Sequence, residues 1–214
     1  MRHVVLIDYG LSNLLSVQRA FEHVGAEVEI ARGPAAVLGA QALVLPGVGA
    51  FRDGMAGLKK LGLIGPIRQK AAAGTPLLGI CLGMQMLFDE GEEFGLRPGL
   101  GLIPGRVVKL PARDAAGAPL RVPQVGWNGL LPPPGRADFA QSALRAVQPG
   151  GEVYFVHSYE AKPACPADRL ADTLYGGRRV CAAARRGSVT GCQFHPEKSG
   201  EVGLSVLRQF LAEG

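Results

Sequence analysis

Hydrophobic residues in the first ninety positions alternate between short unbroken runs and a helical spacing. The unbroken runs predict buried strands at 3–7, 26–30, 42–45 and 76–80. Leu14, Val17, Phe21 and Val24 recur at helical spacing before Gly25, and another apolar helix is expected over 82–88. Continuous aliphatic strands separated by helices are typical of a mostly parallel sheet with helices on both faces, so the pattern predicts an α/β fold.

The middle of the chain, roughly residues 99–160, has a different pattern. Strand-like segments at 106–110 and 152–157 are joined by turn-rich stretches, which predicts an antiparallel extension or edge of the same domain. The chain then returns to strands at 180–184 and 189–194. A last amphipathic helix follows, with Ser199 as its expected N-cap. Without a linker or a repeat, residues 1–214 are expected to form a single domain.

Composition excludes several classes of protein. The chain has 214 residues, of which 47% are hydrophobic and 19% are charged, the reverse of a disordered composition. No apolar run reaches the length of a membrane span, and the N-terminus reads as a strand rather than a signal peptide, which predicts a cytoplasmic protein. None of the four cysteines stands in Cys-x-x-Cys spacing, so neither a structural zinc site nor a disulfide framework is expected.

The charge balance does not indicate nucleic acid. The formal net charge is +5, from 23 Lys and Arg against 18 Asp and Glu. The basic residues are dispersed in short pairs without interleaved aromatics, which favours a solvated face, or a surface for an acidic partner or a phosphorylated metabolite.

The strongest local signal for chemistry surrounds Cys81. This cysteine stands between the end of an expected strand and the start of an expected helix, with Gly79 two residues before it and Gly83 two after. That arrangement is typical of a nucleophile elbow, with cysteine in place of serine. Side chains at the flanking positions would collide in so sharp a turn, and glycine avoids the collision. A helix N-terminus also favours the thiolate. The alternative is an inert buried cysteine beside a glycine-rich turn.

A nucleophilic thiol needs a base, and His195 is the better of two candidates. Glu197 follows two residues later, so in an extended backbone both side chains point to the same side, as in a catalytic triad. His157 has an acid in Glu160, but on a strand those two face opposite sides. The alternative for His195 is a surface His-Pro turn with an incidental acid.

Two further features suit an acyl-transfer site. The backbone N–H of Leu82 and the glycine loop 46–49 are candidate donors to an oxyanion, although an ordinary turn would also explain the loop. Gln85 lies one helical turn after Cys81, where its amide could hold a polar substrate, unless it is simply exposed.

These segments together resemble the class I, triad-type glutamine amidotransferases, and more narrowly the glutaminase subunits of imidazole glycerol phosphate synthase. Residues 79–85 and 193–199 are similar to the two catalytic motifs of the wider family, and 46–51 to its oxyanion strand. Segments 123–128 and 154–159 are similar to ones more specific to the subunit. The resemblance covers nearly the whole chain and implies a flavodoxin-like fold.

The resemblance also implies a mechanism and roles for individual residues. Cys81 would attack the glutamine amide, His195 would move protons, and Glu197 would orient His195. The implied remaining positions are backbone N–H groups of Val48 and Leu82 for the oxyanion, Gly49, Gln85, Ser158 and Tyr159 for glutamine, and Asn13, Trp127, Asn128 and Tyr154 for the interface with a partner. That partner would be a (β/α)8-barrel cyclase of histidine biosynthesis, which receives the ammonia. No cofactor and no metal is implied.

One departure and three alternatives complete the prediction. Ser12 stands where the family usually has glycine, which puts the shape of the partner-facing turn in doubt because serine tolerates left-handed geometry poorly. The alternatives are a glutaminase for anthranilate or pyridoxal phosphate synthesis, a free-standing γ-glutamyl hydrolase and a non-catalytic binding subunit. The loop 47–51 and the segment 126–128 count against the first, and the complete triad counts against the last.

Overall fold

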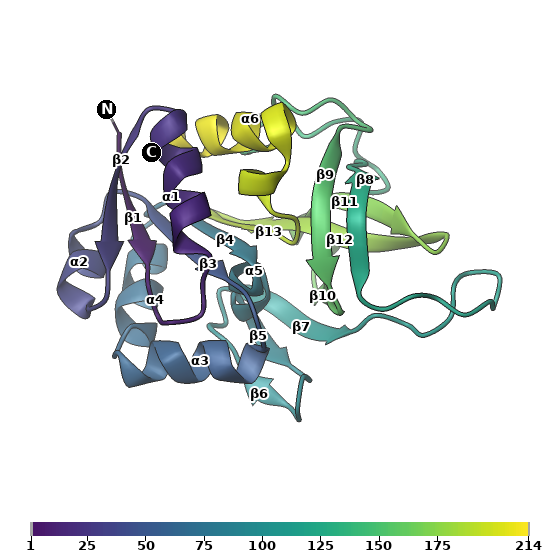
Figure 1. Ribbon diagram of the computed structural model, residues 1–214, viewed down its shortest axis with the longest axis horizontal. Coiled ribbons are helices and arrows are strands. Elements are labelled where there is room, and N and C mark those ends of the chain that lie inside the picture. The colour runs from purple at the N-terminus through teal and green to yellow at the C-terminus, as the bar shows by residue number, and fades with distance from the viewer. Residues whose placement is uncertain (1, 214) are drawn as a thin grey trace.

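A seven-stranded sheet forms the centre of the computed structural model, which describes residues 2–213 (Figure 1). Its strand order is β11-β12-β13-β4-β3-β1-β2. The strands are β1 Arg2–Ile7, β2 Ala26–Ala31, β3 Leu43–Gly47, β4 Leu77–Cys81, β11 Arg169–Tyr175, β12 Arg178–Arg186 and β13 Val189–Cys192. The run β2-β1-β3-β4-β13 is parallel and has the flavodoxin-like order, whereas β12 and β11 add an antiparallel edge. The α/β prediction is confirmed; Met1 and Gly214 of the expected domain lie outside the described residues.

Helices cover both faces of this sheet, as the aliphatic strands predict. The helices are α1 Leu14–His23, α2 Pro34–Gly39, α3 Phe51–Lys60, α4 Ile64–Ala72, α5 Leu82–Met86 and α6 Gly200–Leu211. In Figure 1, α1 and α6 lie on one side of the sheet and α3 and α4 on the other. Each side buries its own apolar cluster, with Phe21 and Phe210 packed edge to face in the first, and Met55 and Leu58 in the second.

The middle of the chain forms two further sheets instead of lengthening the central one. One has the order β10-β7-β5-β6 and the other pairs β8 with β9. Their bounds are β5 Phe88–Gly91, β6 Arg97–Pro98, β7 Ile103–Lys109, β8 Gln124–Gly129, β9 Glu152–His157 and β10 Tyr159–Pro163. The β8–β9 ribbon stands beside the carboxyl end of β4, so it forms a wall over the strand that carries Cys81 (Figure 1).

Two local expectations differ from the structure for identifiable reasons. The helix expected over 82–88 ends at Met86, because the carbonyls of Met86 and Leu87 accept hydrogen bonds from the N–H groups of Leu100 and Leu102. Strand β5 then begins at Phe88. Ser199 does occupy the N-cap position of α6 but makes no capping hydrogen bond. Its hydroxyl donates to the carbonyl of His195 instead.

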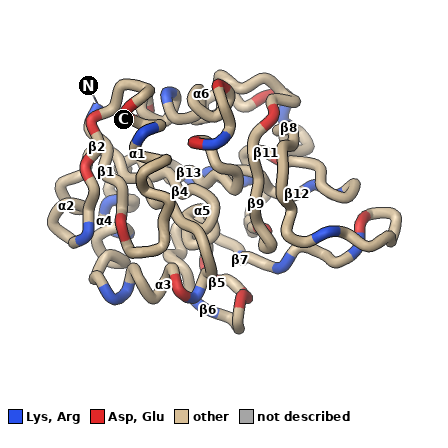
Figure 2. Tube along the Cα trace, viewed as in Figure 1, with Lys and Arg blue, Asp and Glu red and all other residues tan. Residues whose placement is uncertain are grey.

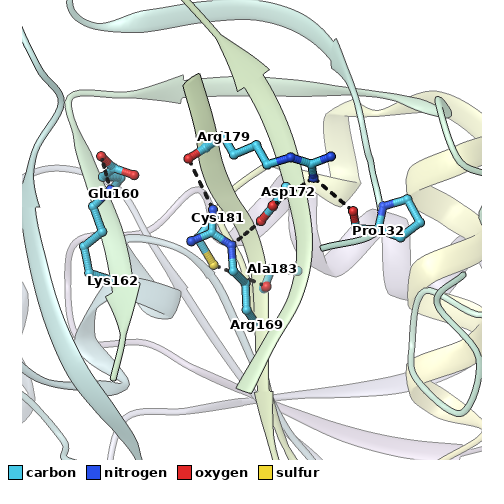
Figure 3. A network of polar contacts seen from close by, with 8 residues as sticks. All are labelled: Pro132, Glu160, Lys162, Arg169, Asp172, Arg179, Cys181 and Ala183. Carbon is cyan, nitrogen blue, oxygen red and sulfur yellow. Dashed lines mark hydrogen bonds and ion pairs between the residues drawn. The ribbon is translucent and has the colours of Figure 1, made fainter. Parts of the chain in front are cut away.

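A buried polar cluster fixes the antiparallel edge of the central sheet (Figure 3). Asp172 on β11 is completely buried, and its two carboxylate oxygens accept from Arg169 and Arg179 respectively. Arg179 also donates to the carbonyl of Pro132 at 3.0 Å. Backbone hydrogen bonds join Asp172 to Leu131 in both directions, at 2.7 and 2.8 Å. The cluster therefore holds the segment that follows β8 against β11.

Charged residues are scattered along the whole trace, with Lys and Arg interspersed among Asp and Glu (Figure 2). No helix within residues 2–213 combines the length and apolarity needed to span a membrane.

Candidate active site

The backbone turns sharply at Cys81, the last residue of β4 and the N-cap of α5. Its φ of 54° is rare for a residue other than glycine, which marks local strain. A Cβ on Gly79 would lie 2.8 Å from the backbone of Gly83, and one on Gly83 would lie 1.7 Å from the carbonyl oxygen of Leu45. The two glycines therefore allow the turn to fit against β3, with the sulfur at the carboxyl end of the parallel strands.

His195 and Glu197 form a buried pair beside that turn. The Nδ1 atom of His195 lies 2.8 Å from Oε1 of Glu197, and the two side chains are 2% and 1% exposed. A Pro196–Lys198 3₁₀ turn makes this contact. The loop is tied to β9, because His195 N–H donates to the Tyr154 carbonyl at 3.0 Å and Ser199 accepts from Tyr154 N–H.

The surroundings of His195 favour its protonated form. Burial by itself lowers the pKa of His195, but the neighbouring Cys81 and Glu197 outweigh burial and raise the pKa to about 10. Its Nε2 atom has no partner of normal hydrogen-bond geometry. Since Glu197 occupies Nδ1, Nε2 is the ring nitrogen left without a hydrogen-bond partner.

A cavity of about 320 Å³ opens onto Cys81 and His195. It gathers eight of the residues predicted for the site, leaving Glu197 behind His195: Val48, Gly49, Cys81, Leu82, Gln85, Ser158, Tyr159 and His195. Glu93, Pro123, Val156 and His157 complete its lining. The volume lies within the range of small-molecule sites.

The two expected oxyanion donors are in different states. Leu82 is the first residue of α5, where helix geometry leaves the backbone N–H without an intrahelical acceptor. The N–H of Val48 instead donates to the carbonyl of Leu11 at 3.0 Å, so it is already engaged within the protein. Gly49 has a φ of +95°, a conformation that glycine adopts readily. The site is thus assembled around Cys81 with one donor engaged elsewhere.

Gln85 faces the cavity but is already engaged within the protein. Its Nε2 donates to the carbonyl of Tyr159 at 3.1 Å and to Oε1 of Gln193 at 3.0 Å. Only its carbonyl oxygen therefore remains to meet a ligand.

The contacts of His157 differ from those expected of a catalytic base. Its Nδ1 lies 2.8 Å from the carbonyl of Tyr159, which can only accept, so Nδ1 carries the proton and Nε2 is an acceptor without a partner. Burial lowers the pKa of His157 to about 4, with a smaller contribution from His195. No contact joins His157 to Glu160, whose carboxylate pairs with Lys162 at 2.8 Å.

Glu93 is a cavity residue that the sequence analysis missed. One of its carboxylate oxygens accepts from Phe51 N–H at 2.8 Å, which caps the start of α3. Partial burial, together with Glu93 and Glu92, raises the pKa of Tyr159, which also lines the cavity. The only sequence signal for Glu93 is an acidic stretch after α5, which is indistinguishable from a solvated loop.

The predicted interface residues are not among those that line the cavity. Trp127 on β8 is 51% exposed, and its ring meets Tyr154 edge to face at 6.1 Å. Asn128 is partly exposed and donates to the Leu174 carbonyl, whereas Asn13 precedes α1 without capping it. Ser12 does not adopt a positive φ; Gly10 takes that role with a φ of +94°, so the substitution at Ser12 does not strain the turn.

Comparison with known proteins agrees with this geometry. Residues 5–213 match the family model for glutamine amidotransferase class-I. The chain is 49% identical over 211 residues to imidazole glycerol phosphate synthase subunit HisH 1 of Legionella pneumophila (strain Lens), which covers 99% of both chains. It is 46% identical to subunit HisH of Lactococcus lactis subsp. lactis (strain IL1403) over the full length of both.

Solved structures support the fold at lower identity. A crystal structure of a glutamine amidotransferase superposes with a TM-score of 0.72 at 20% identity, covering 98% of this chain and 99% of that chain. PurLQS from Thermotoga maritima gives a TM-score of 0.72 at 18% identity, covering 99% and 98%. The sequence matches, which span the segments that build the cavity, decide the family: the chain belongs to the class-I glutamine amidotransferases and, among them, to the HisH subunits of imidazole glycerol phosphate synthase.

Proposed function

We propose that Cys81, His195 and Glu197 carry out the glutaminase reaction of this family in one domain, and that the ammonia passes to a cyclase partner. The observation that carries the proposal is the buried contact of His195 with Glu197 beside a strained cysteine, all at the end of one cavity. That arrangement is the one a nucleophile, base and orienting acid require.

The chemistry follows from the positions of the protons. Cys81 transfers its proton to His195, and the thiolate attacks the side-chain amide carbon of glutamine. The tetrahedral intermediate collapses when His195 returns the proton to the leaving nitrogen, which departs as ammonia and leaves a glutamyl thioester. Water, deprotonated by His195, then hydrolyses the thioester to glutamate and regenerates the thiol. Glu197 stabilises the imidazolium in both half-reactions.

The lining of the cavity suits the two ends of glutamine. The carboxylate of Glu93 and the negative field around Tyr159 favour an α-ammonium group at that side. The carbonyl oxygen of Gln85 is free to accept from the substrate, and Gly49 and Ser158 add polar backbone and hydroxyl groups to the lining.

The donor state of Val48 supports control by the partner. While Val48 N–H is held by Leu11, the oxyanion meets one donor less, and loss of one such donor lowers the rate roughly 10²–10³-fold. Leu11 belongs to the same turn as Asn13, a predicted interface residue, and Trp127 and Tyr154 offer further aromatic rings for docking. A (β/α)8-barrel cyclase that displaces this turn would free the donor after rotation of the 47–49 backbone.

The names of the relatives favour this partner over those of anthranilate or pyridoxal phosphate synthesis, because both HisH relatives are subunits of imidazole glycerol phosphate synthase. The nucleophile must remain a free thiol, which suits the reducing cytoplasm.

The test is Cys81→Ala in complex with the cyclase subunit. Glutamine-dependent turnover should disappear, while turnover with added ammonium salt should remain, because the variant changes only the ammonia supply. Cys165→Ala is the matched control, since Cys165 is a free, exposed thiol outside the cavity and its loss should change neither rate. Glutamine hydrolysis by Cys81→Ala would remove the proposed nucleophile, and full hydrolysis by the isolated wild-type chain would favour a free-standing hydrolase.

A further inference from the structure

Gln193 is completely buried next to the proposed nucleophile, although it neither belongs to the proposed triad nor lines the cavity. Its Nε2 atom lies 3.8 Å from the sulfur of Cys81, within hydrogen-bond range for sulfur, and its Oε1 accepts from Gln85. It directly follows β13, the parallel neighbour of the strand that ends in Cys81. Two glutamine amides and one backbone carbonyl thus form a chain that ends at the reactive sulfur.

The orientation of both amides follows from the acceptor at the start of that chain. The Tyr159 carbonyl can only accept, so the Gln85 atom that faces it must be the amide nitrogen. The same nitrogen faces Gln193, which must therefore present its oxygen to Gln85. The amide of Gln193 is then forced to point its N–H groups toward Cys81.

The contacts of the sulfur depend on its charge. In the thiol form, Cys81 donates to the Val156 carbonyl at 3.9 Å, a contact that favours the protonated state. An N–H from Gln193 favours the opposite state, because a hydrogen bond to an ionised acceptor is stronger than one to a neutral acceptor. The amide of Gln193 does not ionise. Rotating its oxygen toward the sulfur would break its hydrogen bond with Gln85.

We propose that Gln193 stabilises the thiolate of Cys81 as a hydrogen-bond donor, and that Tyr159 and Gln85 form a relay that keeps this donor oriented. The inference rests on the proposed role of Cys81 as nucleophile and deepens it. Tyr159 and Gln85 also line the cavity, so a bound glutamine contacts the relay at one end while the nucleophile contacts it at the other. The same amides would therefore influence both the binding of substrate and the ionisation of the nucleophile.

The test measures the rate of iodoacetamide alkylation of each cysteine as a function of pH, with peptide mass spectrometry as the readout. Gln193→Met keeps the length and shape of the side chain but has no N–H. The pH of half-maximal alkylation of Cys81 should rise by about one unit, equivalent to a tenfold smaller reactive fraction at lower pH. Gln85→Met should give a smaller rise, because Gln193 remains but is no longer held. Glutamine turnover of Gln193→Met should fall in parallel, by roughly tenfold.

Two controls separate this effect from general disturbance. Cys165 is an exposed thiol in the same chain, and its alkylation profile should not move in any variant. Thr190→Val alters another buried polar side chain on β13, whose hydroxyl lacks a partner, and should leave the Cys81 profile unchanged. An unchanged Cys81 profile in folded Gln193→Met, or an equal change in Thr190→Val, would overturn the relay.

A measurement on the wild-type side chain covers the case in which Gln193→Met fails to fold. The side-chain amide NMR signal of Gln193 should shift with pH at the midpoint of Cys81 alkylation and should lose that titration in Cys81→Ala. A Gln193 signal that ignores Cys81 contradicts the relay while leaving the nucleophile intact. Retained glutamine hydrolysis by Cys81→Ala would instead contradict the proposed function, whatever Gln193 does.

Discussion

Two buried polar clusters lie in the same sheet, and they are built in opposite ways. At the β11 edge, both carboxylate oxygens of Asp172 are paired, one with Arg169 and one with Arg179. Around Cys81, at the end of β4, three strands away, polar atoms are buried without partners. These atoms are Nε2 of His195, Nε2 of His157, Oε2 of Glu197 and the hydroxyl of Tyr9.

The difference separates a cluster that holds the fold from one that is arranged for a ligand. A buried polar atom without a partner costs roughly 1–3 kcal/mol, so four of them close together are a substantial destabilisation. A bound substrate, whose amide and ammonium groups bring hydrogen-bonding capacity, can use some of them. Proteins commonly give up local stability in this manner at reactive sites.

The largest effect is expected from a substitution of His195 that removes the function of the Cys81 cluster but keeps its packing. His195→Asn keeps an N–H for Glu197 but has no nitrogen to exchange a proton with Cys81. Glutamine hydrolysis should fall by at least about 10⁴-fold, as for removal of a triad member. Steady-state assays of glutamate release would measure the loss of activity, and circular dichroism should show that the variant is still folded.

His157→Ala is the matched comparison within the same cavity. Because the neutral His157 contacts Tyr159 rather than Glu197, this variant should bind glutamine more weakly or couple less well to the partner, yet retain measurable hydrolysis. If His157→Ala were the more damaged enzyme, the base would be His157.

The next-largest effect is expected at Asp172, where a substitution should lower the stability of the fold without lowering enzymatic activity. Asp172→Ala leaves two arginine side chains without their buried counter-charge, and breaking such a pair typically costs about 3–5 kcal/mol. Denaturant unfolding should report that loss, while kcat for the folded fraction stays near the wild-type value. Asp53→Ala, which removes an exposed ion pair with Arg52, should barely change either. A catalytic defect in folded Asp172→Ala would show that the two clusters are coupled.

The two clusters also differ in how far the sequence could predict them. Residues near Cys81 were found because flanking glycines, His195 and Glu197 occur in short local patterns whose geometry follows from strand and helix periods. The mostly parallel sheet was likewise predicted from aliphatic strands that alternate with helices, whereas the flavodoxin-like order was implied only by the family resemblance. Nothing local marks Asp172, whose arginine partners are reached only through the β11–β12 pairing.

Contacts formed between distant segments were missed for the same reason. Glu93 enters the cavity because the segment after α5 folds back onto the start of α3, and Gln193 reaches Cys81 across a strand pair. The engagement of Val48 by Leu11 depends on a single backbone orientation, which no residue type specifies. The end of α5 at Met86 was decided by hydrogen bonds from residues 100–102, not by its own apolar pattern.

A smaller, conditional effect tests whether the Cys81 cluster waits for its partner. The isolated chain should hydrolyse glutamine slowly, since Val48 N–H is held by Leu11, and cyclase with its nucleotide ligand should raise the rate about a hundredfold, the value of one oxyanion donor. Trp127→Ala, which removes a half-exposed ring from β8, should lower the stimulated rate far more than the basal one. Glutaminase assays with and without the cyclase measure both. A Trp127→Ala enzyme that is stimulated normally would move the docking surface elsewhere.

The smallest effect distinguishes the two histidines of the cavity by pH. The pKa of His157 is lowered to about 4 in the folded state, so between pH 6.5 and 4 the unfolded chain binds a proton that the folded chain does not, and stability falls as pH falls. The pKa of His195 is raised to about 10, so its contribution is fully present below pH 6.5 and is lost as pH rises toward 10. Together they place a stability maximum near pH 6.5, with a change of about 1 kcal/mol for the first pH unit on either side. Urea unfolding at pH 5.5, 6.5 and 7.5 would measure it: His157→Gln should flatten the acid limb and His195→Asn the alkaline limb. If His157→Gln left the acid limb as steep as in the wild type, His157 would be protonated in the folded protein, and its place as a neutral acceptor facing the substrate would be wrong.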